Sequence, residues 1–179
     1  MRKNVPYDFE VYTIDLTKVD ERELEFDFVL NDAFFSALDQ TEIMGGDVSV
    51  KLSIRKVSST YEFIFNVKGW VDVTCDRCLT EMHYPVETEK ELFVKLGDKT
   101  EEVDENLILV SEEEKKLKVD WLMYEFIVLS LAVKRVHDEG ECDPDMIALL
   151  AEHNAELNEE KKQEPDPRWD ELKKILDNN

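Results

Sequence analysis

Hydrophobic and polar residues alternate with a period of two through most of residues 7–96. The clearest run places Val48, Val50, Leu52 and Ile54 between polar neighbours, and a Ser-Ser-Thr turn follows it. This period is typical of strands with one buried and one solvated face, and such runs separated by turns predict an antiparallel meander. The expected strands cover residues 7–11, 24–30, 48–55, 61–67, 70–75, 82–86 and 91–96.

Apolar residues at helical spacing predict two helices before the C-terminal part of the chain. Asn31 suits the N-cap of a short helix that ends before Gly45 and Gly46. Residues 119–133 predict a buried helix, because their apolar stretch is shorter than the about 20 residues of a membrane span. Lys134 and Arg135 after it are interpreted as complements of its C-terminal dipole. The charged residues 99–106 are expected to form a loop.

The last part of the chain is strongly acidic and predicts a helical tail. One helix is expected to begin at Asp143 and Pro144, with a polar continuation over residues 151–163 that is either a solvated helix or a linker. A final helix beginning at Pro167 presents Trp169 on its apolar face. Trp169 is interpreted as a clamp onto the rest of the protein, with an anchor for a partner as the alternative.

These patterns predict an α+β protein. The N-terminal two thirds are expected to form an antiparallel β meander or barrel-like sheet, followed by helices and a C-terminal helical tail. The expected division is a mainly antiparallel β domain with a buried helix over residues 1–142, and an acidic helical tail over residues 143–179. Aromatic residues within the strands, namely Phe63, Phe65 and Trp70, are expected to face the core.

Composition adds a large negative charge to this picture. The 179 residues are 42% hydrophobic, which is enough for a core, and 43 Asp and Glu against 22 Lys and Arg give a formal charge of −21. Such a field repels nucleic acid and attracts basic partners. No apolar signal segment follows Met1, so the sequence predicts a cytoplasmic protein without a membrane segment, whose three cysteines are reduced or bind a metal.

The placement of the cysteines predicts a metal site. Cys75 and Cys78 form a CxxC motif at a tight connection between two expected strands, and His137 and Cys142 lie far downstream. Together they match the Cys3His set of a structural zinc site. Two alternatives stay open: ordinary reduced cysteines, and a redox switch through a disulfide. His83 also competes for the fourth position, but its place on a strand between two inward residues predicts exposure to solvent.

Motifs of catalysis are missing from the sequence. It contains no Walker loop, GxGxxG, GxSxG or HExxH pattern. A metal held by four protein ligands has no open position for water, so the expected zinc is structural and joins the β part to the start of the tail. The protein is not expected to be an enzyme.

Several motifs together resemble the YceD family of bacteria and plastids. The resemblance extends over residues 48–179 and includes the segment at 103–109. The family patterns CxRCL, HxxxxC and DPRWxxL correspond to Cys75, Arg77, Cys78, Leu79, His137, Cys142, Asp166, Pro167, Arg168, Trp169 and Leu172. Relatives usually carry prolines before the histidine, whereas residues 131–136 have none, so the preceding helix is expected to run further here. The acidic insert at 154–164 is interpreted as particular to a subgroup.

The resemblance implies a function. Members are described as large ribosomal RNA subunit accumulation proteins, needed for normal 23S rRNA levels, and no enzymatic activity is assigned to them. We therefore expect a non-catalytic ribosome-biogenesis factor that binds a basic large-subunit ribosomal protein or a pre-50S particle. Protein binding is expected over direct RNA binding, because the chain lacks the cations that neutralise phosphates. The alternative is a cysteine-based redox or zinc-responsive regulatory protein.

Overall fold

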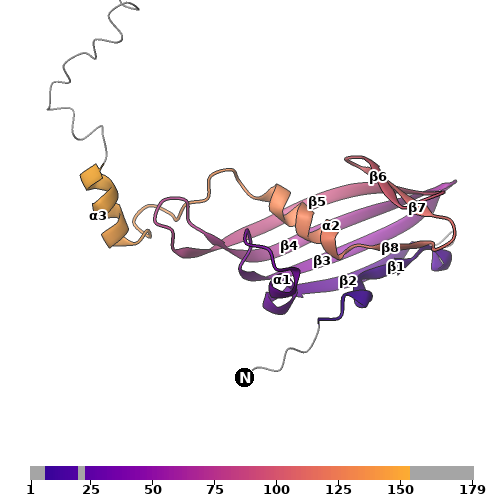
Figure 1. Cartoon of the computed structure of the whole chain (residues 1–179), viewed down its shortest axis with the longest axis horizontal. Coiled ribbons are helices and arrows are strands. Elements are labelled where there is room, and N and C mark those ends of the chain that lie inside the picture. The colour runs from indigo at the N-terminus through magenta and orange to yellow at the C-terminus, as the bar shows by residue number, and fades with distance from the viewer. Residues whose placement is uncertain (1–6, 20–22, 154–179) are drawn as a thin grey trace, which may run out of the picture. The chain divides into compact units, whose positions relative to one another are not determined.

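The computed structural model describes residues 7–19 and 23–153, which form two compact units with the boundary between Val136 and His137. The first unit contains all described strands and the helices α1 and α2 (Figure 1). The large sheet consists, in spatial order, of β2 (Leu24–Asn31), β3 (Gly45–Val57), β4 (Thr60–Thr74), β5 (Glu81–Gly97), β7 (Leu107–Ser111) and β6 (Glu101–Asp104). A separate antiparallel ribbon pairs β1 (Thr13–Asp15) with β8 (Lys116–Lys118).

The sheet is mixed and mostly antiparallel. β2 to β5 form the predicted meander, β7 joins β5 in parallel, and β6 closes the order as an antiparallel edge. Among the described strands β2 and β6 stand at opposite ends of this order, so the sheet is open and not a closed barrel. The predicted α+β class, with the sheet in the N-terminal two thirds and helices after it, is confirmed.

The turn between β3 and β4 sits where the sequence predicts it. Val57 pairs with Thr60, which leaves the two-residue connection Ser58 and Ser59, and Ser58 has φ of 58°. Two-residue hairpins favour such positive φ values because their backbone then follows the strand twist. The strands run longer than predicted: residues 61–67 and 70–75 belong largely to the continuous β4, and residues 82–86 and 91–96 both belong to β5.

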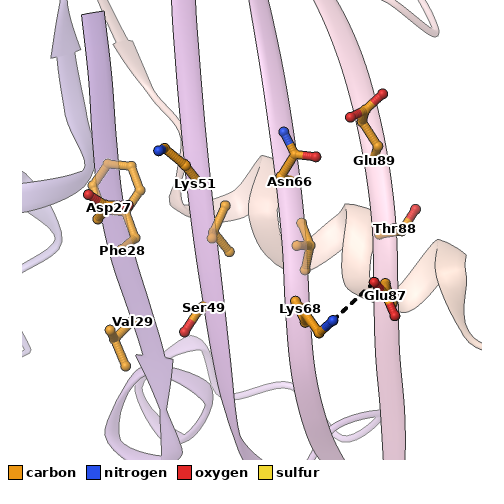
Figure 2. A pocket seen from close by; sticks show the side chains of 12 residues that line it. Asp27, Phe28, Val29, Ser49, Lys51, Asn66, Lys68, Glu87, Thr88 and Glu89 are labelled. Carbon is orange, nitrogen blue, oxygen red and sulfur yellow. Dashed lines mark hydrogen bonds and ion pairs between the residues drawn. The ribbon is translucent and has the colours of Figure 1, made fainter.

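One face of the sheet is solvated. Figure 2 shows polar side chains of neighbouring strands, among them Lys51, Lys68 and Glu87, on the face away from the helix behind the sheet. Lys68 Nζ lies 3.2 Å from Glu87 Oε1 on the adjacent strand. Such exposed cross-strand pairs contribute little stability, and their main effect is to keep this face wet.

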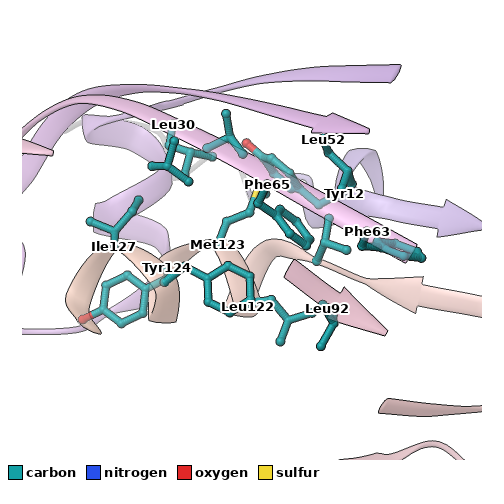
Figure 3. Close-up of a cluster of buried hydrophobic side chains, with 14 of the residues drawn as sticks. Tyr12, Leu30, Leu52, Phe63, Phe65, Leu92, Leu122, Met123, Tyr124 and Ile127 are labelled. Atoms are coloured by element: carbon teal, nitrogen blue, oxygen red, sulfur yellow. The ribbon is translucent and has the colours of Figure 1, made fainter. Parts of the chain in front are cut away.

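The opposite face carries the hydrophobic core (Figure 3). Phe63 and Phe65 are fully buried on β4 and pack with Leu92 of β5 under α2 (Asp120–Ser130). The Phe65 ring meets Phe126 of α2 edge to face, with centroids 5.1 Å apart. Burying each such side chain contributes about 1.5–3 kcal/mol before entropy is counted, so this layer is the main source of stability.

Trp70, however, is 38% exposed, so the prediction that it faces the core is wrong.

Helix α1 (Asp32–Leu38) begins as predicted. The Asn31 side-chain oxygen accepts hydrogen bonds from the backbone N–H groups of Ala33 at 3.1 Å and Phe34 at 3.3 Å. An N-cap satisfies amide groups that have no partner within the helix. The helix ends at Leu38, where Asp39 takes the left-handed conformation with φ of 54°, and Gly45 already belongs to β3.

The first predicted strand, over residues 7–11, is wrong. Phe9–Tyr12 forms the 3-10 helix η1, because the Asp8 carboxylate accepts a hydrogen bond from the Glu10 N–H at 3.0 Å and caps a turn. Val11, which the alternation placed inward, is 61% exposed, whereas Tyr12 is buried. The local cap therefore prevails over the alternating pattern.

Two further predictions on the first unit, the type of one element and the end of another, are wrong. Residues 99–106 contain the strand β6 in place of an uninterrupted loop, because pairing with β7 suffices to hold a charged strand at a sheet edge. Helix α2 ends at Ser130 and does not reach Val133, since Leu131 is extended with φ of −69° and ψ of 141°. The absence of prolines in residues 131–136 thus does not lengthen the helix.

The second unit contains α3 (Pro144–His153), which begins where the sequence predicts it. The Asp143 side chain accepts a hydrogen bond from the Met146 N–H at 2.9 Å, and Pro144 occupies the first helical position. The predicted continuation over residues 154–163 and the final helix with Trp169 lie outside the described residues. No helix in the described part of the chain is long and apolar enough to cross a membrane.

Candidate metal centre

The Cys75–Cys78 motif forms the turn that connects β4 to β5. The Cys75 N–H donates to the Thr80 carbonyl at 2.9 Å, and the Leu79 N–H donates to the Cys75 carbonyl at the same distance. Leu79 takes φ of 61°, which lets the chain reverse within this short loop. The Cys75 and Cys78 side chains are 0% and 2% exposed. The turn therefore holds both sulfurs close to one point, as the sequence predicts.

Hydrogen bonds to sulfur further define this turn. The Arg77 N–H donates to Cys75 Sγ at 3.4 Å, and Cys78 Sγ lies 3.1 Å from Thr80 Oγ1. A backbone N–H aimed at sulfur favours the negatively charged thiolate, which is the form that ligates a metal. The local backbone thus favours a metal-binding thiolate at Cys75, while the Thr80 hydroxyl lies beside the sulfur of Cys78.

Asp76, between the two cysteines, binds the segment that follows α2. Its N–H donates to the Arg135 carbonyl at 2.7 Å, and its carboxylate accepts from the Arg135 N–H at 2.6 Å. The Arg135 guanidinium also lies 3.6 Å from Glu42 and 3.9 Å from Asp76. Arg135 therefore does not complement the C-terminal dipole of α2, which ends five residues earlier, and that interpretation is wrong.

The other two ligand candidates lie on one short loop. His137 and Cys142 flank a turn in which the Glu141 N–H donates to the Asp138 carbonyl at 3.1 Å. Gly140 has φ of 90°, a conformation that side chains disfavour, so glycine permits the reversal. Asp143 then caps α3 directly after Cys142. The loop ends are thus defined by local hydrogen bonds.

The structure brings all four predicted side chains together. One ligand atom each of Cys75, Cys78, His137 and Cys142 lies within 4.8 Å of every other. Ligand atoms around a tetrahedral zinc, with bonds of about 2.3 Å, lie about 3.8 Å apart, so small side-chain rotations suffice to enclose one ion. Three sulfurs and one imidazole are donors that favour zinc over magnesium or calcium. The residues present therefore fit a Zn²⁺ ion.

The competing histidine is elsewhere. His83 lies on β5 with a side chain 70% exposed, and its Nδ1 pairs with Asp72 on β4. Its ring stacks edge to face on Trp70, with centroids 4.5 Å apart. The prediction that His83 faces solvent is confirmed, and among the described residues it is not part of the cysteine cluster.

Sequence reasoning missed the pairing of Asp76 with Arg135. The two residues are 59 positions apart, and neither belongs to a pattern of known spacing. The only signal was their opposite charge beside the candidate ligands, which many surface pairs share. Their importance lies in position, because Arg135 precedes His137 by two residues.

Fold and site together define an acidic α+β protein with a Cys3His cluster at a β turn. The chain matches the family described as large ribosomal RNA subunit accumulation protein YceD over residues 64–176, which is more than half of its length and includes all four cluster residues. The protein belongs to the YceD family. Searches of curated proteins and of solved structures found no match.

Proposed function

We propose that this protein is a non-catalytic, cytoplasmic ribosome-biogenesis factor that supports accumulation or processing of 23S rRNA. It acts by binding a basic protein of the large subunit or a pre-50S particle. The family description, which concerns accumulation of the large ribosomal RNA subunit, supports the biological role. The formal charge of −21 is the observation that supports a basic partner.

The charge favours a protein partner over RNA. A protein that binds RNA through its phosphates gains affinity by placing Lys and Arg against them. The chain contains 43 acidic and 22 basic residues, so its net negative charge repels RNA and attracts a basic ribosomal protein. Binding a cationic protein before it reaches the ribosome is the task that this field suits.

We also propose that Cys75, Cys78, His137 and Cys142 hold one structural Zn²⁺. The proximity of their ligand atoms and their donor chemistry support this assignment. Four protein ligands leave the ion no position for water or substrate, so the site stabilises the fold and performs no reaction. This agrees with a binding protein that is not an enzyme.

A binding experiment tests the main proposal. Purified protein is titrated at physiological salt with individual basic large-subunit proteins and, separately, with 23S rRNA fragments. We expect at least one ribosomal protein to bind with affinity that falls as salt rises, and the RNA fragments to bind weakly. Tight binding to 23S rRNA with no binding to any basic ribosomal protein would show the choice of partner to be wrong.

The cysteine cluster favours one alternative function, a redox or zinc-responsive regulator. Three sulfurs lie close enough that loss of the ion could be followed by disulfide formation between two of them, with a two-electron oxidant as acceptor. This alternative predicts reversible zinc loss under mild oxidation together with changed partner binding. Zinc that is retained in the presence of hydrogen peroxide, with partner binding unchanged, contradicts it.

A further inference from the structure

A groove of about 660 Å³ lies in the first unit between α2 and the β6–β7 hairpin, both labelled in Figure 1. Its helical wall consists of Leu122, Glu125, Phe126 and Leu129. Their spacing of i, i+3, i+4 and i+7 places them on one face of α2. The groove therefore follows a single stripe of the helix, as a binding site for an elongated segment does.

The floor of the groove is apolar and its edge leaves apolar side chains in water. Leu92 of β5 is buried in the floor, and Phe126 is buried at the base of the helical wall, with 2% and 8% exposure. At the rim, Leu129 of α2 is 66% exposed and Val103 of β6 is 55% exposed. Large apolar side chains that stay exposed beside an apolar floor mark a surface that another molecule can cover.

The rim of the groove is acidic. The lining contains four acidic residues, namely Glu102, Asp104 and Glu105 on the hairpin and Glu125 on α2. Lys90 is the one cation among the lining residues. Glu102 pairs opposite Ile108 in the register of β6 and β7, so its side chain shares the face of the sheet that bears α2. Carboxylates that surround an apolar floor attract a segment with the opposite charge.

The groove is held in place before any partner binds. The Phe93 N–H of β5 donates to the Asn106 carbonyl at 2.8 Å, which attaches the hairpin turn to the central sheet. The Glu105 N–H donates to the Asp104 carboxylate, also at 2.8 Å, within the turn itself. A preformed site loses less conformational entropy on binding than one that must be ordered.

We infer that this groove binds a basic amphipathic segment of a partner protein. The segment would place apolar side chains over Leu129 and Val103 and Lys or Arg side chains against the acidic rim. The inference rests on the proposed function and specifies the surface through which it operates. RNA is disfavoured by the same rim. The chain's own residues 154–179 are a poorer match, because they carry eight acidic and five basic side chains.

Charge neutralisation tests the groove. The triple variant Glu102→Gln, Glu105→Gln, Glu125→Gln removes rim charge and spares Asp104, which caps the turn. The matched control is Glu87→Gln, Glu89→Gln, Glu91→Gln, three exposed carboxylates at the alternating positions of β5 on the opposite face. We expect the groove variant to bind individually purified basic large-subunit proteins about tenfold more weakly, with a shallower salt dependence, and the control to stay within about twofold.

A photo-crosslinking residue at position 129 identifies the occupant directly. The same residue at Val29, which is 59% exposed on β2, is the control. With purified large-subunit proteins present, we expect position 129, and not position 29, to crosslink to a basic ribosomal protein. Crosslinks from position 129 to residues 154–179 or to a second copy of the chain would overturn the inference.

The outcomes separate the groove from the proposed function. If the wild-type protein binds basic ribosomal proteins, and only the β5 control weakens that binding, the groove is not the binding surface. The proposed function then still stands. If the wild-type protein binds none of them, the proposed partner class itself is wrong. If the groove variant alone loses affinity, both are supported.

Discussion

Asp76 and Arg135 hold each other through reciprocal hydrogen bonds: the Asp76 N–H donates to the Arg135 carbonyl, and the Asp76 carboxylate accepts from the Arg135 N–H. The pair ties the β4–β5 turn to the extended segment after α2. Because Asp76 lies between Cys75 and Cys78, and Arg135 lies two residues before His137, the pairing restricts where the chain can run next to the turn. The pairing therefore reduces the conformational entropy that the chain loses when a metal site is assembled.

We predict that Asp76→Ala destabilises the protein by about 1–2 kcal/mol. The substitution leaves the Arg135 N–H without its charged acceptor, and hydrogen bonds to charged groups contribute about 1.5–3 kcal/mol when they are buried. The lower figure is used because the Asp76 side chain is 39% exposed. Urea denaturation measures the change, and Asp98→Ala, at an exposed position after β5, is the control expected to alter stability by less than about 0.5 kcal/mol.

We predict one zinc per chain in protein produced with zinc available, and less than half of that in Cys142→Ser. A serine hydroxyl is a poor substitute for a thiolate ligand. His137→Ala is expected to lower the zinc content as well, whereas the matched variant His83→Ala keeps it, because His83 pairs with Asp72 outside the cluster. Inductively coupled plasma mass spectrometry gives the stoichiometry. Equal zinc content in all four proteins would exclude the assigned site.

We predict that removing zinc with a chelator lowers the thermal unfolding midpoint of the wild-type protein. Metal binding adds to stability because the ligands are preorganised only in the folded state. The same chelator should leave the midpoint of Cys142→Ser nearly unchanged. Differential scanning fluorimetry compares the two proteins. A chelator effect of equal size in both would point to an action unrelated to these ligands.

We predict that Phe65→Ala costs about 3–5 kcal/mol of unfolding free energy. Phe65 is fully buried and its ring packs against Phe126, so the substitution removes transfer energy and leaves a cavity. Val29→Ala, on the wet face of the sheet, should cost less than about 1 kcal/mol. Urea unfolding followed by tryptophan fluorescence provides both values, and similar losses at the two positions would contradict the assignment of the core face.

We predict that stability falls as pH rises above about 10. Burial, and then the hydrogen bond to Tyr7, raise the pKa of the Tyr12 hydroxyl, whereas an unfolded tyrosine ionises near pH 10. Above that pH the unfolded state binds fewer protons than the folded state, so the free energy of unfolding decreases as pH rises, whereas below it the contribution of Tyr12 to stability does not change with pH. Tyr12→Phe should make the decrease less steep, as measured by urea unfolding between pH 8 and about 11. An unchanged slope would assign the pH dependence to other groups.

Much of the sheet could be predicted because its signal is local and strong. The alternation around Val50 and Leu52 arises from one wet and one buried face, and the pairing of β3 with β4 realises both. The Asn31 cap and the start of α3 could also be predicted, since each depends on side chains within a few residues. The candidate ligands were predicted from spacing and residue type alone, and their proximity agrees with that prediction.

The errors share a different physical origin. The strand β6 consists mostly of charged residues, and its conformation depends on pairing with the neighbouring β7, which no local sequence pattern predicts. The position of Arg135 depends on contacts with Asp76 in the β4–β5 turn and with Glu42, both far away in sequence. The groove combines residues of α2, β5 and the β6–β7 hairpin, which only folding brings together.

The sequence by itself determined the class of fold, the strongly negative field and the identity of the four candidate ligands, because periodicity, charge and residue chemistry are properties of short segments or of the whole composition. The tertiary structure decided which distant segments meet. Reciprocal bonding of Asp76 with Arg135, the nearness of the four ligand atoms and the acidic rim around an apolar floor each require residues separated by many positions in the chain. Such contacts form only when the core closes, and local sequence patterns do not encode their geometry.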